Sequence, residues 1–148
     1  MFRNILVPVD GSPRSRRASL NAVRFAKEQS ARITGIYVAP PYRPNVNEAS
    51  IRRDFVPPHE YERRVKATAD RVLRPLRKAA LVAGVRCEAL SAVGDYPYEE
   101  IVKAAQGRKC DLIYMASHGR RGLSLLILGS ETNKVLSHCK VPVLVERV

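Results

Sequence analysis

The chain has 148 residues, of which 45% are hydrophobic and 27% charged, and this length and balance predict one globular domain spanning residues 1–148. The sequence has no uninterrupted apolar run of the roughly 18 residues that a membrane helix needs, and its first residues do not resemble a signal peptide. These features exclude a membrane-spanning protein, and we expect a cytoplasmic location with no membrane partner.

The net charge of +12 is large for so short a chain and predicts an anionic partner. Nucleotide, nucleic acid, acidic protein and anionic lipid are all candidates on charge alone. Aromatic residues make up only 6% of the chain and are not interleaved with the basic clusters, which disfavours nucleic acid without excluding it.

The three cysteines, Cys87, Cys110 and Cys139, are an odd number without C-x-x-C spacing, so we expect free thiols. The three histidines have no metal-ligand spacing with each other or with the cysteines.

Residues 4–9 form a short apolar run that is typical of a fully buried parallel strand. Ser12 and Pro13 follow it as a helix cap and a first helical residue, and they predict a helix to about residue 29. A second strand is expected at residues 32–38. The proline-rich segment 39–57 is predicted to be a loop, either a lid over a site or a surface excursion without a role.

Apolar residues recur at helical spacing from about residue 59 to 83, and Gly84 is a natural cap for the end of this helix. Pro75 lies inside the pattern, where it removes a backbone hydrogen bond and is expected to kink the helix. The same alternation continues with a strand at 85–93, a helix from about 97 to 107, a strand at 111–117, a helix at 130–138 and a last strand at 141–146.

Strands that alternate with helices predict right-handed crossovers and an open parallel sheet. The fold class is therefore α/β, with three α/β/α layers and a sheet of five strands in the assumed order 3-2-1-4-5. Ligands bind such sheets at the carboxyl ends of the strands, where the strand order reverses. Residues 8–12 and 115–119 would then meet at one crevice between the first and fourth strands.

The stretch from Asp111 to Thr132 combines a buried strand, a loop of glycine and arginine, and the start of a helix. This order favours phosphate binding, because glycine leaves backbone N–H groups accessible and a helix dipole attracts an anion to its N-terminus. Asp10, across the crevice, is an acceptor for a ribose hydroxyl or an adenine amine. The candidate phosphate-binding residues are Gly119, Arg120, Arg121, Gly122, Gly129 and Ser130.

Each candidate also has a purely structural interpretation. Asp10 is placed to cap the first helix, Ser130 to cap the last one, and both arginines to be solvated. His118 is expected to make a structural hydrogen bond rather than to act as a base. The sequence lacks a G-x-x-x-x-G-K-[ST] loop and a G-x-G-x-x-G after the first strand, which disfavours a P-loop NTPase or a dinucleotide dehydrogenase.

The sequence resembles the universal stress protein family over nearly its whole length. The stretches that carry the resemblance are Ile5–Ser12, Ala116–Ser124, Leu128–Ser130 and Val141–Val145. Members of the ATP-binding branch carry G-x-x-G, nine residues and then G-[ST]. Gly119 and Gly129-Ser130 fit this pattern, whereas Ala116 stands in place of its first glycine. The extra methyl group would crowd a nucleotide if Ala116 needed a positive φ.

The resemblance implies a Rossmann-like fold of the adenine-nucleotide alpha hydrolase type, with ATP or another adenine nucleotide as cofactor. By position, it implies that Pro8, Val9, Asp10 and Val38 surround the base and ribose, and that Met115, Ala116, Gly119, Gly129, Ser130 and Glu131 follow toward the phosphates. Glu131 would either be bridged by a metal ion such as Mg²⁺ or point away. Family members commonly form homodimers through the last strand, here residues 141–146, whose apolar edge suits self-pairing.

The leading hypothesis is a cytoplasmic, dimeric, ATP-binding stress-response module whose signal is its nucleotide state. A second hypothesis is a slow ATPase or an autophosphorylating protein. Its candidate residues, Ser12, Ser117, His118 and Ser130, show no base–nucleophile pair by spacing. A third hypothesis rests on charge alone and is a module that binds nucleic acid or an acidic partner.

Overall fold

The computed structural model describes residues 1–43, 56–118 and 128–147 of the chain. Its elements are β1 (Asn4–Pro8), α1 (Pro13–Gln29), β2 (Arg32–Ala39), α2 (Pro58–Ala83), β3 (Cys87–Val93), α3 (Pro97–Gly107), β4 (Leu112–Ala116), α4 (Ser130–His138) and β5 (Val143–Glu146). The predicted alternation of strands and helices is confirmed. The last strand begins after Pro142, which has no N–H and contributes its carbonyl oxygen to Ile113 N–H instead, at 2.9 Å.

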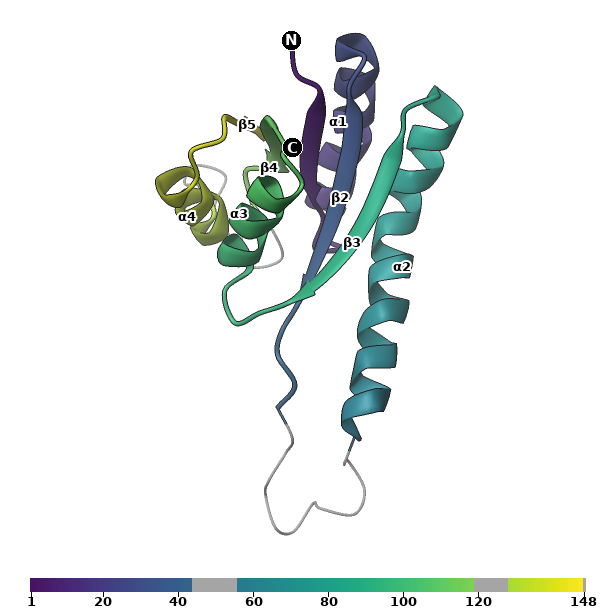
Figure 1. Ribbon diagram of the computed structural model, residues 1–148, viewed down its shortest axis with the longest axis vertical. Helices are drawn as coiled ribbons and strands as arrows, with labels where there is room; N and C mark the ends of the chain where they lie inside the picture. Colours follow the sequence, from purple (N-terminus) through teal and green to yellow (C-terminus); the bar gives the residue numbers. More distant parts are fainter. Residues whose placement is uncertain (44–55, 119–127, 148) are drawn as a thin grey trace.

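The described strands form one parallel sheet of five strands in the order β3-β2-β1-β4-β5, which confirms the predicted order (Figure 1). The central strand β1 lies between β2 and β4, and Ile5 is in register with both Ile33 and Leu112. The strand order therefore reverses at β1 and β4, where an α/β sheet opens a crevice at the carboxyl ends of its strands.

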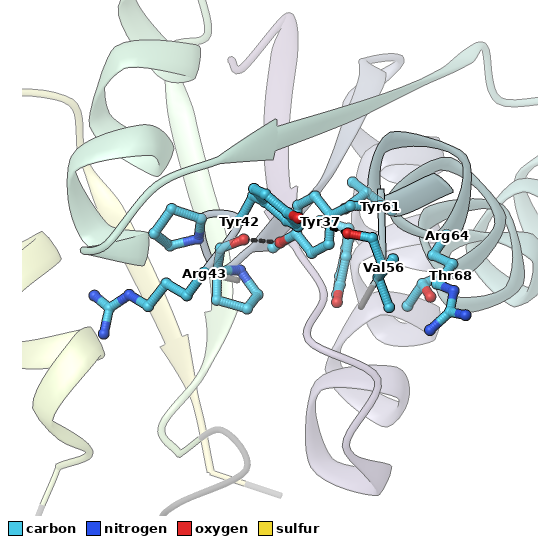
Figure 2. Close-up of a pocket in the computed structure, with 11 residues that line it drawn as sticks. Tyr37, Tyr42, Arg43, Val56, Tyr61, Arg64 and Thr68 are labelled. Atoms are coloured by element: carbon cyan, nitrogen blue, oxygen red, sulfur yellow. Dashed lines mark hydrogen bonds between the residues drawn. The ribbon is translucent and has the colours of Figure 1, made fainter. Parts of the chain in front are cut away.

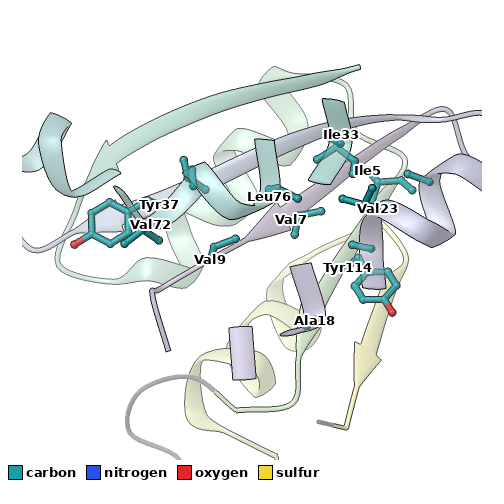
Figure 3. Close-up of a cluster of buried hydrophobic side chains, with 14 of the residues drawn as sticks. Ile5, Val7, Val9, Ala18, Val23, Ile33, Tyr37, Val72, Leu76 and Tyr114 are labelled. Atoms are coloured by element: carbon teal, nitrogen blue, oxygen red, sulfur yellow. The ribbon is translucent and has the colours of Figure 1, made fainter. Parts of the chain in front are cut away.

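The helices cover both faces of the sheet, with α1 and α2 on one side and α3 and α4 on the other (Figure 1). Successive side chains of a strand point to opposite faces, so Ile5 and Val7 join the core beneath α1 and α2 (Figure 3), whereas Leu6 joins the core beneath α3 and α4. Burial on both faces explains why these strands read as continuous apolar runs. No described helix combines the length and the apolar character needed to cross a membrane.

The helix boundaries follow the predicted capping residues. The Ser12 hydroxyl accepts the Ser15 N–H at the start of α1, and Pro13 is the first helical residue. Gly84 ends α2 with a φ of 72°, the left-handed conformation that glycine adopts without strain. Helix α2 continues through Pro75, so the proline removes one backbone bond without ending the helix.

Gly35 allows α2 to lie close to β2. A Cβ atom at this position would be 2.7 Å from Leu76 Cδ2 and 3.4 Å from Leu73 Cδ2, and both leucines are almost fully buried. The absent side chain therefore sets the spacing between the helix and the strand.

Candidate functional site

The carboxyl ends of β1, β2 and β4 meet at one edge of the sheet. Pro8, the last residue of β1, pairs with Ile36 of β2, and on its other side β1 pairs with β4 at Ile5–Leu112 and Leu6–Ile113. Val38 and Met115 pack with the core beneath α3 and α4, and Pro8 shares that face because it lies two residues beyond Leu6. These three residues form an apolar wall at the edge of the sheet.

The remaining predicted strand-end residues lie on the opposite face. Val9 and Ala116 are both buried in the core beneath α1 and α2. Ala116 is the last residue of β4 and is not among the described non-glycine residues with positive φ, which are Ser30 and Lys109. Its methyl group therefore imposes no backbone strain, and the departure from glycine is compatible with the local conformation.

Asp10 lies just beyond β1, in the turn that starts α1. Its Oδ1 accepts the Ser12 N–H at 2.9 Å and the Ser15 hydroxyl at 2.5 Å. The Ser12 hydroxyl in turn accepts the Ser15 N–H at 3.1 Å. The N-cap of α1 is Ser12 rather than Asp10, whose carboxylate bonds that cap and is held by this network at the carboxyl edge of the sheet.

The N-terminus of α4 is attached to the end of β4. The Gly129 N–H donates to the Ser117 carbonyl oxygen at 2.8 Å, and the Thr132 hydroxyl lies 3.2 Å from the Ala116 carbonyl oxygen and 3.3 Å from that of Ser117. A Cβ atom on Gly129 would be 3.1 Å from the Ser117 carbonyl oxygen and 3.3 Å from His118 Cα. Glycine at 129 therefore permits a close contact between two backbone segments.

Ser117 and His118 follow β4 and are both buried. His118 is only 7% exposed, and its Nδ1 lies 3.1 Å from the Ser117 hydroxyl oxygen. His118 therefore hydrogen-bonds Ser117, and its assignment as structural rather than as a base stays a prediction.

Comparison with known proteins agrees with this arrangement. The model of the universal stress protein family matches residues 1–147. The chain belongs to the universal stress protein family. Universal stress protein YxiE of Bacillus subtilis is 34% identical over 156 aligned positions, which cover 99% of this chain and 100% of YxiE. The solved structure of MJ0577, from Methanocaldococcus jannaschii, has a TM-score of 0.80 and 26% identity, and the match covers 100% of this chain and 97% of that one.

Two further solved structures share the fold and are complexes. A universal stress protein in complex with cAMP has a TM-score of 0.71 and 23% identity, with coverage of 99% of this chain and 97% of that chain. The universal stress protein of Archaeoglobus fulgidus in complex with dAMP has a TM-score of 0.63 and 19% identity, with coverage of 97% and 96%. At these identities the likeness is one of fold.

The pattern expected for the ATP-binding branch of universal stress proteins is only partly covered by the described residues. Gly119, Arg120, Arg121 and Gly122 lie outside them. Gly129 and Ser130 lie within them, and Gly129, not Ser130, is the N-cap of α4. The interpretation of Ser130 as a cap is therefore wrong. Gly129 has extended backbone angles and its carbonyl oxygen accepts the first helical N–H, so Ser130 is already helical.

The Glu131 side chain is turned toward α3. Its Oε2 accepts the Tyr98 N–H at 3.1 Å, and its Oε1 pairs with Lys134 Nζ at 3.1 Å. Tyr96, the N-cap of α3, makes no side-chain hydrogen bond to the first turn of the helix. The backbone N–H groups of that turn have no partner within the helix, and the Tyr98 N–H therefore bonds the Glu131 carboxylate. Of the two orientations considered for Glu131, the structure has the one that points away from the crevice.

Two hydrogen bonds to the Glu146 carboxylate connect β5 to β4 and to α1. The Tyr114 hydroxyl donates to Glu146 Oε2 at 2.9 Å, and Asn21 Nδ2 donates to Glu146 Oε1 at 2.5 Å. Burial, followed by the hydrogen bond to the carboxylate, raises the pKa of Tyr114 well above its usual value. The phenol therefore stays protonated and keeps β5 tied to the rest of the sheet.

Sequence reasoning missed Thr132. The side chain is 2% exposed and its hydroxyl reaches the end of β4, yet in the sequence it is one more polar residue in a helical first turn. The signal that was available is its position three residues after Gly129, which places it on the same side of α4 as the helix N-cap.

Proposed function

We propose that this protein binds an adenine nucleotide, ATP, in the crevice between β1 and β4, and that its nucleotide state is the signal of a cytoplasmic stress-response module. The observation that carries the proposal is the contact between Gly129 and Ser117, which fixes the N-terminus of α4 at the carboxyl edge of the sheet. The first backbone bond within α4 runs from Asn133 N–H to the Gly129 carbonyl oxygen. The preceding helical amides have no partner inside the helix, and such amides favour phosphate.

The proposed roles follow from the faces of the strands. Pro8, Val38 and Met115, which share one face, are proposed to hold the base, whereas Val9 is buried on the opposite face and belongs to the proposal on its sequence position alone. Asp10 is proposed to accept a hydrogen bond from a ribose hydroxyl, because its carboxylate lies just beyond the carboxyl end of β1. The adenine preference is supported by the cAMP and dAMP complexes of proteins with the same fold.

The phosphates are proposed to lie at the start of α4, against Gly129 and Ser130. Gly119, Arg120, Arg121 and Gly122 belong to this proposal on their sequence pattern. Within residues 1–43, 56–118 and 128–147 there is no group of three or more His, Cys, Asp or Glu residues arranged to hold a metal ion. A Mg²⁺ ion arriving with ATP would supply charge neutralisation and would be held mainly by phosphate oxygens and water. Glu131 is directed elsewhere.

The test begins with the ligand itself. The purified protein is denatured, the supernatant is analysed for nucleotide, and the ligand-free protein is titrated with ATP by calorimetry. We expect an adenine nucleotide to co-purify or ATP to bind. A correctly folded sample that does neither refutes the proposal.

Two variants separate binding from folding. Asp10→Ala removes the proposed ribose acceptor together with part of the α1 cap, and we expect ATP affinity to fall by about ten-fold, the effect of losing a charged hydrogen-bond partner. Ser12→Ala removes the cap hydroxyl but leaves the Asp10 carboxylate, so it is the matched control. Equal loss of ATP affinity in both variants would assign the effect to the cap.

We also propose that the protein is a homodimer paired through β5. This strand is one edge of the sheet, and its residues Val143–Glu146 are only half-buried. An apolar edge strand presents unpaired N–H and C=O groups that a second copy can satisfy. Sedimentation equilibrium is expected to give twice the chain mass of 16.5 kDa, and a monomer at all concentrations would exclude the dimer.

A further inference from the structure

The structure contains a hollow on the other face of β2 from the proposed nucleotide crevice. It has a volume of about 510 Å³ and lies between the end of β2 and the N-terminal half of α2 (Figure 2). Tyr37 and Ala39 line it from β2, whereas Val38, between them, faces α3 and α4. The hollow and the crevice are therefore separated by the sheet itself. Its volume is within the range of about 300–1,000 Å³ found for small-molecule sites.

Aromatic and apolar side chains form most of its wall. Tyr61, Arg64, Val65 and Thr68 follow one another at helical spacing along the face of α2 that looks toward β2. The rings of Tyr42 and Tyr61 are 5.4 Å apart, between centroids. Their hydroxyls donate to the carbonyl oxygens of Val56 and Pro40 respectively, so both are used to join the end of β2 to the start of α2 (Figure 2).

Two other hydroxyls in the hollow, those of Tyr37 and Thr68, do not bond a backbone carbonyl oxygen of the described residues. Tyr37 is only 6% exposed and lines the hollow, yet its hydroxyl has no hydrogen-bond partner among the residues that the structure describes. The Thr68 hydroxyl, on the facing helix, likewise has none within the described ranges. Among the described residues no fully buried side-chain oxygen or nitrogen lacks a hydrogen-bond partner, so both hydroxyls reach the open space of the hollow, where a ligand can bond them.

The hollow also has a cation beside Thr68. Arg64 lies next to Thr68 on α2 (Figure 2). Its Nε bonds Glu60 at 3.1 Å. Among the described residues Glu60 is its one carboxylate partner, and the Arg64 side chain is 62% exposed. Arg43, the other arginine of the lining, extends away from the tyrosines and pairs with Asp95 at 2.5 Å. Arg64 is thus the group that would receive an anion.

We propose that this hollow is a second ligand site and that it takes a small planar aromatic carboxylate. The rings and apolar side chains would hold a flat aromatic body, the Tyr37 and Thr68 hydroxyls would bond its polar edge, and the Arg64 guanidinium would pair with its carboxylate. The net charge of +12 favours the approach of an anion. The site is distinct from the nucleotide crevice, and its existence does not depend on ATP binding.

The test compares two probes of the same shape. 2-Naphthoate carries the carboxylate, and 2-naphthamide is its uncharged counterpart. We expect calorimetry to show 2-naphthoate binding more tightly than 2-naphthamide to the wild-type protein. Arg64→Gln should weaken 2-naphthoate by about five-fold or more and leave 2-naphthamide unchanged, because only the first uses the guanidinium.

Two matched variants separate the roles of the guanidinium and the phenol from general effects of charge and folding. Arg63→Gln removes the neighbouring arginine, which bonds the same Glu60 carboxylate at 2.7 Å but does not line the hollow, and it should leave both affinities within about two-fold. Tyr37→Phe removes a hydroxyl without a protein partner among the described residues, so it should weaken both probes and leave the urea midpoint unchanged.

Three results would overturn the proposal. One is the absence of 2-naphthoate binding at millimolar concentration. Another is equal loss of affinity in Arg64→Gln and Arg63→Gln, which would mean a diffuse charge effect. The third is loss of binding in Asp10→Ala with full binding in Tyr37→Phe, which would place the probe in the nucleotide crevice.

Discussion

Gly129 offers the sharpest test of how α4 is held at the candidate site. Replacing it by alanine adds one methyl group whose carbon would stand 3.1 Å from the Ser117 carbonyl oxygen and 3.3 Å from His118 Cα. Both neighbours are backbone atoms, so no side-chain rotation can relieve the contact. The N-terminus of α4 must move away by a few tenths of an ångström, and the 2.8 Å bond from Gly129 N–H to Ser117 must lengthen.

The expected cost has two parts. Overpacking by one methyl group against fixed atoms costs about 1–3 kcal/mol of unfolding free energy. Because the same shift carries the orphan amides of α4 away from the end of β4, we also expect ATP affinity to fall by about ten-fold, the effect of weakening a hydrogen bond to a charged group. Urea denaturation measures the first effect and calorimetry the second.

Gly107→Ala is the matched control. Gly107 ends α3, has an ordinary φ, and a Cβ atom there would have nothing within 4 Å. Alanine is the better helix former, so this variant should be unchanged or more stable by up to about 1 kcal/mol. If Gly129→Ala were as stable as Gly107→Ala and bound ATP equally well, α4 would not be positioned by close contact with β4.

Three further predictions concern the packing around the sheet. Gly35→Ala should destabilise the protein by about 1–3 kcal/mol, and should cost less in a Leu76→Ala background, because that change removes the atom 2.7 Å from the new methyl group; equal costs in both backgrounds in urea titrations would disprove the clash. Thr132→Val should lower the unfolding free energy by about 0.5–1.5 kcal/mol through loss of the hydroxyl contacts to Ala116 and Ser117, and an unchanged urea midpoint would count against them. The folded pKa of Tyr114 is raised above the ordinary value of 10.0, so its stabilising contribution is complete below pH 10 and is lost as pH rises toward the folded pKa. The unfolding free energy should therefore fall more steeply above pH 10 in the wild-type protein than in Tyr114→Phe, by at most about 1.4 kcal/mol per pH unit, and parallel pH profiles would contradict the assignment.

The elements and the fold class could be predicted from the sequence because its apolar runs, capping residues and alternation of elements agree, whereas the strand order was assumed. Continuous apolar runs at residues 4–9 and 111–117 indicate strands buried on both faces, and Ser12-Pro13 and Gly84 mark helix ends that the structure confirms. Alternation of strands and helices then leaves few topologies, of which the order 3-2-1-4-5 is one. The helix predicted through Pro75 is present as α2, whose apolar face packs against the sheet, and the kink expected at Pro75 stays a prediction.

The site was only partly predictable, because its details depend on the direction of side chains rather than on their positions in the chain. Glu131 and Thr132 are adjacent in the sequence, yet one carboxylate reaches Tyr98 of α3 while the neighbouring hydroxyl reaches the end of β4. Helical geometry separates consecutive residues by about 100°, so a register error of one residue exchanges their roles. Tyr37 and Val38 pose the same problem in a strand, where consecutive side chains face opposite sides of the sheet. A family pattern that assigns Val38 to the nucleotide therefore says nothing of Tyr37, and the hollow beside it emerges only when α2 is placed against β2.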